Sequence, residues 1–162
     1  GLVQTMDYSR ASMTQHAIAD ADIEVRLTAR LRRQQTLQRT DLSYSALIGE
    51  PALRTIVGDP SIQAAQLRAL LAAAKRRNVS VRVVPAAGQG HPGQLGAFMT
   101  LWFPSEHPIV HVEMATSGAF LDKDPQVQPY LDALPRIEAV ALSGTESLRL
   151  IANIVREMEA ST

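Results

Sequence analysis

The chain has 162 residues, which is close to the length of one domain, so we expect a single domain over residues 1–162. Apolar residues make up 46% and charged residues 20%, a balance typical of a soluble globular protein and not of a disordered chain. Cysteine is absent, which excludes a disulfide scaffold, a thiol nucleophile and a cysteine-ligated metal centre. No apolar run is long enough to span a membrane and no signal peptide is recognisable, so we expect a cytoplasmic protein without membrane contact.

Two helices are predicted first, over residues 5–17 and 20–38. In the second, Ile23, Leu27 and Leu31 recur every four residues and so share one helix face. The pattern then changes to alternation over residues 42–48, which predicts a strand, and a short helix is expected from Pro51 to residue 57. A long apolar helix opening at Asp59 leads to a second strand over residues 79–84. This strand–helix–strand unit is long enough for a parallel crossover.

The second half of the chain is predicted to begin with a glycine-rich loop over residues 86–96. Two strands follow, over residues 98–103 and 109–113, and the short connection between them predicts an antiparallel pair. We expect a helix that starts at Pro129 and is kinked by Pro135, and a last helix whose capping box is Ser143 and Glu146. The predicted fold is α/β or α+β, a mixed sheet of about four strands covered by helices, with helical N- and C-terminal segments.

A metal or acid–base site is one interpretation of three polar residues in this half. His111 and Glu113 share a face of their predicted strand, and His91 lies in the preceding loop. The alternative is a half-exposed strand face beside a polar loop, a common arrangement. Neither a nucleophile motif nor a phosphate loop is present. We therefore favour the alternative, and predict no metal, no cofactor and no catalytic residue.

A ligand-binding mouth is predicted at the carboxyl end of the two parallel strands, where ligands bind in open sheets. Glu50 follows the first strand and His91 lies in the loop that leaves the second, so we expect Glu50, His91 and Glu113 to border one polar opening. Phe98 and Trp102 would form its apolar wall. In the alternative, Glu50 caps its helix and Glu113 pairs with an arginine such as Arg54.

Basic residues form a stripe on the second predicted helix, at Arg26, Arg30 and Arg33. The stripe is either an anion or nucleic-acid contact or a solvated face. Because 16 basic residues match 16 acidic ones and the net charge is zero, we favour the solvated face. We predict that this chain alone does not bind duplex DNA specifically.

The last helix carries more apolar residues than one core-facing stripe requires. Leu150 lies well around the helix from Ile151 and Ile154. This width predicts a homodimer that uses the terminal helices, whereas the alternative is that Leu150 is a scattered surface leucine.

Short motifs in fixed order over most of the chain resemble a known family, the C-terminal domain of unknown function of actinobacterial Xre-type helix-turn-helix regulators, some of them called antitoxin-like. The matching residues are Gly1-Leu2-Val3-Gln4-Thr5, Asp7-Tyr8, Ala11, Arg30, Arg33-Gln34, Glu50, Ala52-Leu53-Arg54, Val57-Gly58, Gln66-Leu67, Asn78-Val79, Val81, Val83, Pro85, Gly90-His91-Pro92-Gly93, Phe98, Phe103, Val112-Glu113, Tyr130, Ala141-Leu142-Ser143, Glu146-Ser147 and Ile151. The resemblance implies transcriptional regulation, in which this domain senses a small-molecule ligand or pairs with a small partner protein. Members often sit beside a short companion protein. The usual preceding helix-turn-helix is absent before Gly1, so we expect an excised or stand-alone copy.

Two classes of function therefore compete. The first is a regulatory sensor or protein-interaction domain of this family. The second is a small enzyme that uses Glu50, His91 and Glu113 as acid–base groups at the sheet edge. The absence of a catalytic motif favours the first.

Overall fold

The structure is a computed structural model that describes residues 1–113 and 117–160. It confirms the α+β class and the helical terminal segments. The chain divides into two compact units, which we call the first unit (Gly1–Ala86 and Leu142–Thr162) and the second unit (Ala87–Ala141). None of the described helices is long and apolar enough to cross a membrane.

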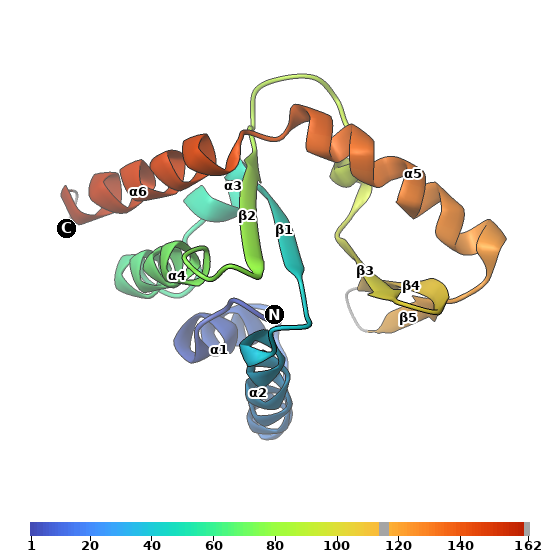
Figure 1. Ribbon diagram of the computed structural model, residues 1–162. Helices are drawn as coiled ribbons and strands as arrows, with labels where there is room; N and C mark the ends of the chain where they lie inside the picture. Colours follow the sequence, from blue (N-terminus) through green and yellow to red (C-terminus); the bar gives the residue numbers. More distant parts are fainter. Residues whose placement is uncertain (114–116, 161–162) are drawn as a thin grey trace. The chain divides into compact units, whose positions relative to one another are not determined.

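The first unit begins with helices α1 (Met6–Gln15) and α2 (Asp20–Gln34), and the 3₁₀ turn η1 (Gln35–Gln38) extends α2 (Figure 1). The side-chain oxygen of Thr5 caps α1 by accepting a hydrogen bond from the N–H of Tyr8. These elements match the two predicted helices to within about two residues at each end, apart from the 3₁₀ turn.

A parallel strand pair follows, as predicted. Strand β1 (Tyr44–Gly49) leads through α3 (Glu50–Arg54) and α4 (Pro60–Ala73) to β2 (Val79–Val84), and Tyr44 lies opposite Val79 in the register. The carboxylate of Asp59 caps α4. The last helix, α6 (Gly144–Ala160), starts at the predicted capping box, in which the Glu146 carboxylate accepts hydrogen bonds from the N–H and hydroxyl of Ser143.

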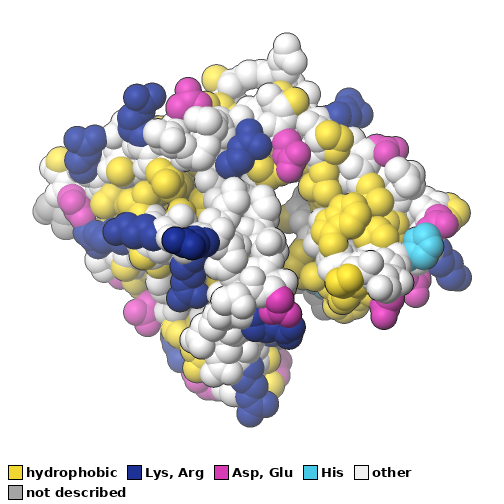
Figure 2. All heavy atoms as spheres, in the orientation of Figure 1, with side chains coloured by type: hydrophobic (Ala, Val, Ile, Leu, Met, Phe, Trp, Pro, Cys, Tyr) yellow, Lys and Arg dark blue, Asp and Glu magenta, His cyan; other side chains and the backbone are white. Residues whose placement is uncertain are grey.

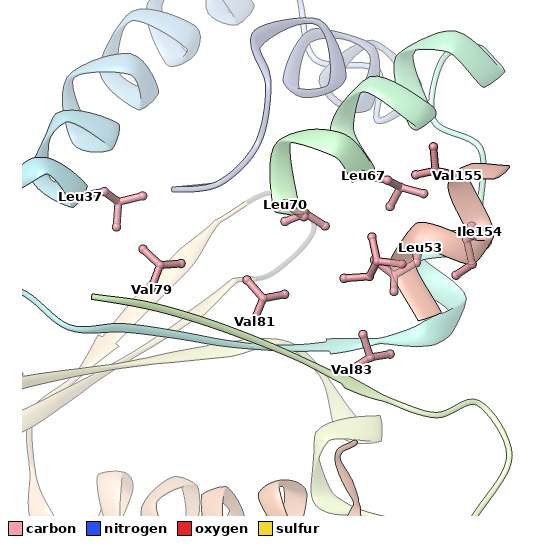
Figure 3. Packing of buried hydrophobic residues seen from close by; sticks show 10 residues of the cluster. Leu37, Leu53, Leu67, Leu70, Val79, Val81, Val83, Ile154 and Val155 are labelled. Carbon is pink, nitrogen blue, oxygen red and sulfur yellow. The ribbon is translucent and has the colours of Figure 1, made fainter. Parts of the chain in front are cut away.

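The core of the first unit lies on one face of β1 and β2, against α4 and α6 (Figure 3). Val79, Val81 and Val83 alternate along β2 and all point into it. The other buried members are Leu37, Leu53, Leu67, Leu70, Ile151, Ile154 and Val155. Leu150 is half-buried and packs against this same core. The alternative of a scattered surface leucine is therefore wrong, and at this position the wide apolar face of α6 contributes to the core.

The second unit contains the short η2 turn (Pro92–Leu95) and a three-stranded antiparallel sheet of β3 (Phe98–Phe103), β4 (Glu106–Glu113) and β5 (Gly118–Leu121). The predicted antiparallel pairing of β3 with β4 is confirmed. The strands nevertheless form two separate sheets, and β5 was not predicted. Four residues opening on Gly118-Ala119 are too few to show a strand pattern, so β5 depends on its pairing with β4.

Helix α5 (Asp124–Val140) packs against β3 and β4 and corrects one prediction. The helix begins at Asp124 and runs through Pro129 and Pro135, so the predicted start at Pro129 is wrong. Pro125 occupies the first turn, where the missing N–H costs no hydrogen bond. The sequence offers three prolines that could occupy the first turn of this helix. The helix starts before the first of them, and in this register Val127, Ala133 and Ile137 are buried.

Candidate functional site

The carboxylate of Glu50 links the carboxyl ends of the two parallel strands. Glu50 follows β1 directly, and its Oε2 accepts a hydrogen bond of 3.1 Å from the N–H of Ala86, two residues beyond β2. Its Oε1 accepts a second bond of 2.7 Å from Nε of Arg54, one turn along α3. Arg54 also donates from Nη1 to Glu157 on α6 at 3.0 Å. Glu50 thus holds β1, the end of β2 and α6 together through one chain of bonds.

These contacts determine the charge state of Glu50. The Arg54 guanidinium and the Ala86 N–H hold the pKa of the Glu50 carboxyl below its ordinary value, because both stabilise the ionised form. Both oxygens already accept bonds, so Glu50 is a carboxylate with a structural task at the N-terminus of α3. The carboxylate does not cap α3, whose N-cap is Gly49 and which has no side-chain cap bond, so the alternative in which Glu50 caps its helix is wrong.

His91 lies immediately before η2 and is half-buried. A Cβ atom added to Gly93 would come within 3.0 Å of His91 Nδ1 and 3.2 Å of Ile137 Cδ1. The imidazole therefore lies directly over Gly93, on the side where α5 packs. Its Nδ1 atom is buried and has no hydrogen-bond partner within the described part of the chain.

The other three predicted residues lie on β3 and β4. Phe98 is half-buried, with its ring 5.1 Å from that of Tyr130 on α5. Trp102 is exposed, and its Nε1 donates to the Thr100 hydroxyl at 3.2 Å. Glu113 is the exposed last residue of β4, opposite Gly118.

Four of the five predicted site residues thus belong to the second unit and Glu50 to the first, so their convergence stays a prediction. No hydrogen bond or ion pair joins His91 to Glu113 among the described residues. Over residues 1–113 and 117–160, no three His, Asp or Glu side chains group as a metal site. Two hollows of about 480 and 280 Å³ open on the first unit, beside Gly58 and beside Leu2, and neither is lined by a predicted site residue.

Sequence reasoning missed an apolar surface on the three-stranded sheet. Cross-strand partners share a face, and Met99, His111 and Phe120 lie opposite one another on β3, β4 and β5. The same face carries Leu101 opposite Ile109. Alternation along β3 places Phe103 on this face too, beyond a shift in the pairing register with β4. We call these six residues the open face: Met99, Leu101, Phe103, Ile109, His111 and Phe120.

Three of the six residues of the open face are exposed, although they are apolar, and Leu101, Ile109 and His111 are half-buried. The exposed fractions are 68% for Phe120, 42% for Phe103 and 39% for Met99. The rings of His111 and Phe120 lie 4.6 Å apart. Helix α5 packs on the opposite face, which carries Phe98 and the fully buried Val110. In the view of Figure 2, hydrophobic side chains of the second unit gather between α5 and β3.

The neutral total charge conceals an uneven distribution. The first unit contains 14 basic and 10 acidic residues, whereas the second unit contains 2 basic and 6 acidic residues. The first unit therefore has a net charge of +4 and the second of −4. Only the unit boundaries reveal this, because the second unit is an insertion between β2 and α6.

Residues 1–153 match a protein family described as Domain of unknown function (DUF5753). The chain belongs to this family. No curated protein and no solved structure matches the chain.

Several of the motif residues named in the sequence analysis lie near the N-terminus and meet in the structure. Gln66 on α4 accepts a bond from the N–H of Thr5 at 2.7 Å and donates to the carbonyl of Val3 at 2.9 Å. Arg30 on α2 donates to the side-chain oxygen of Gln4 at 2.7 Å, and Gln34 Nε2 donates to the Gln4 carbonyl at 2.6 Å. In this DUF5753 domain, these motif residues hold the N-terminal segment on the first unit.

Proposed function

We propose that this DUF5753 domain is a regulatory protein-interaction module of the kind found in Xre-type regulators, and that its open face binds a small partner protein. The observation that carries the proposal is the exposure of Phe120, Phe103 and Met99 on one sheet face, whose reverse face packs against α5. Exposed aromatic and methionine side chains grouped on a rigid sheet are typical of protein interfaces.

The charge around the open face favours a basic partner. Glu113 is exposed at the end of β4, and Glu106 pairs with Phe103 at its start, so a carboxylate lies near each end of the surface. The second unit has four negative charges in excess. We therefore expect a partner with an apolar centre and lysine or arginine at its rim, bound more weakly as the salt concentration rises.

The competing enzyme hypothesis has less support. Both oxygens of Glu50 already bond to Arg54 and Ala86, and a lowered pKa is unsuited to a general acid at neutral pH. Sensing of a small molecule and the homodimer through the terminal helices stay predictions.

Binding can be measured by titration calorimetry with the short companion protein that the family resemblance implies. We expect Phe120→Ser to weaken binding at least about tenfold, because it removes an exposed aromatic contact. Leu95→Ser is the matched control: Leu95 is 93% exposed in the same unit but lies outside the open face. This control should leave the affinity within about twofold.

Two outcomes would contradict the proposal. One is a companion protein that does not bind the wild-type chain at about 100 µM. The other is binding that Phe120→Ser leaves unchanged while circular dichroism shows both variants folded.

A further inference from the structure

The sheet of the first unit consists of two parallel strands, and its two edges differ in their hydrogen bonding. At the β2 edge, the N–H of Leu142 donates to the carbonyl of Val83 at 2.9 Å. The N–H of Val83 in turn donates to the hydroxyl of Ser147 at 2.9 Å. The segment that leads into α6 therefore closes this edge with its own polar groups.

The β1 edge receives no hydrogen bond of this kind within the part of the chain that the structure describes. Tyr44 donates its N–H to Asn78 at 2.8 Å, so Tyr44, Ala46 and Ile48 point their backbone groups toward β2. In a parallel ladder the residues between them point theirs outward. Ser45 and Leu47 therefore present their N–H and C=O groups on this edge, and Gly49, whose C=O belongs to the N-cap of α3, presents its N–H. No hydrogen bond within the described residues uses these groups.

The usual protections of an edge strand are missing from β1. Its sequence, Tyr-Ser-Ala-Leu-Ile-Gly, contains no charge and no proline, and its register with β2 is regular. Ser45 and Gly49 are exposed. Natural edge strands are protected by lysine, proline, bulges or a covering segment, because a bare edge pairs with another strand. An uncharged and regular edge of this kind is suited to pairing with another strand.

We propose that β1 of a second copy of this chain pairs antiparallel with β1, which gives a four-stranded sheet across a two-fold axis. The outward-facing residues are spaced evenly about Leu47, so the axis pairs Leu47 with its own copy and Ser45 with Gly49 of that copy. No like charges meet within the strands. At the strand ends the charges are already neutralised, by the Arg39–Asp41 pair before β1 and the Glu50–Arg54 pair after it.

This proposed interface differs from the homodimer through the terminal helices that the sequence predicts. A proline substitution in β1 distinguishes the two interfaces. The N–H of Ser45 points away from β2, so Ser45→Pro removes no hydrogen bond of the protomer. The proline removes two donors from the symmetric pair, and its ring obstructs the approaching strand. Ser45→Thr keeps the N–H and suits a strand, so it is the matched control.

Sedimentation velocity on the full chain over about 1–200 µM measures the association. We expect the wild type to dimerise with a micromolar dissociation constant, which Ser45→Pro raises at least about tenfold and Ser45→Thr changes less than about threefold. A chain that stays monomeric throughout, or a dimer equally stable in Ser45→Pro, would overturn the proposal.

Hydrogen exchange on the wild type provides a test that needs no variant. The amides of Ser45, Leu47 and Gly49 should exchange more slowly at about 200 µM than at about 2 µM, because dimerisation pairs them. Slow exchange of these amides at both concentrations would also refute the proposal, since it would mean that the edge is already covered within one chain.

Discussion

The hydroxyl of Ser147 on α6 accepts a hydrogen bond of 2.9 Å from the N–H of Val83 on β2, across 64 residues of sequence. Both residues are completely buried. The same hydroxyl lies 3.4 Å from the carbonyl of Leu142, to which it donates. One hydroxyl therefore provides hydrogen-bond partners for two backbone groups, the Val83 N–H on the β2 edge and the Leu142 carbonyl.

Replacing Ser147 with alanine should destabilise the fold by about 1–3 kcal/mol, because the Val83 N–H then stays buried without a partner. Urea denaturation measures the change in the free energy of unfolding. Thr145→Ala is the control: Thr145 is exposed in the first turn of the same helix, and its loss should cost less than about 0.5 kcal/mol. Equal losses in the two variants would contradict the assigned role of the Ser147 hydroxyl.

Gly58 is expected to tolerate no side chain. Its φ is +76°, and an added Cβ would lie 2.9 Å from Ala11 Cβ on α1 and 3.0 Å from Ile62 Cδ1 on α4. Gly58→Ala should therefore cost about 2 kcal/mol or more in the free energy of unfolding, from backbone strain and from the contacts together. In Gly144→Ala, where nothing lies within 4 Å, thermal denaturation should show a melting temperature equal to or above that of the wild type.

Removal of the Gln66 carboxamide should release the N-terminal segment. Gln66→Ala leaves the Thr5 N–H and the Val3 carbonyl without their partner, which should cost about 1–3 kcal/mol. Hydrogen exchange should show faster exchange at the Thr5 amide specifically. The control Gln38→Ala changes an exposed glutamine and should leave that exchange rate unchanged. An unchanged rate in Gln66→Ala would show that other contacts hold the segment.

The stabilisation by Glu50 should depend on pH. Its folded pKa lies below the ordinary 4.5, so its contribution is fully present above that value and is lost as the pH falls through the folded pKa. We expect Glu50→Gln to be about 1 kcal/mol less stable than the wild type at pH 7, a value reduced because Arg54 is partly exposed. Urea titrations should show this difference unchanged near pH 5.5 and shrinking below about pH 4. A stability difference between Glu50→Gln and the wild type that grows as the pH falls would contradict this prediction. The control Glu157→Gln removes an exposed carboxylate and should lower the free energy of unfolding by less than Glu50→Gln does.

Local signals in the sequence predicted most of the first unit. The alternation of Val79, Val81 and Val83, the cap at Asp59 and the capping box of Ser143 with Glu146 each determine an element through neighbours a few residues away. The position of Glu50 at the end of β1 was predicted for the same reason, and its bond to Arg54 follows the spacing of one helical turn. The bond from Ala86 to Glu50 joins residues 36 apart and depends on the parallel pairing.

Tertiary structure decided the features that local patterns do not encode. Strand β5 exists through its pairing with β4, and α5 begins at Asp124 because buried side chains select its register among three prolines. The open face emerges only when Phe120 lies opposite His111, and the charges of +4 and −4 appear only when the chain is divided into its units. By itself the sequence determined most of the helices and strands, but not β5 or the start of α5, since periodicity and caps act over a few residues. Pairing between strands distant in sequence determined which surfaces the folded chain leaves open, because burial depends on neighbours that the linear order does not specify.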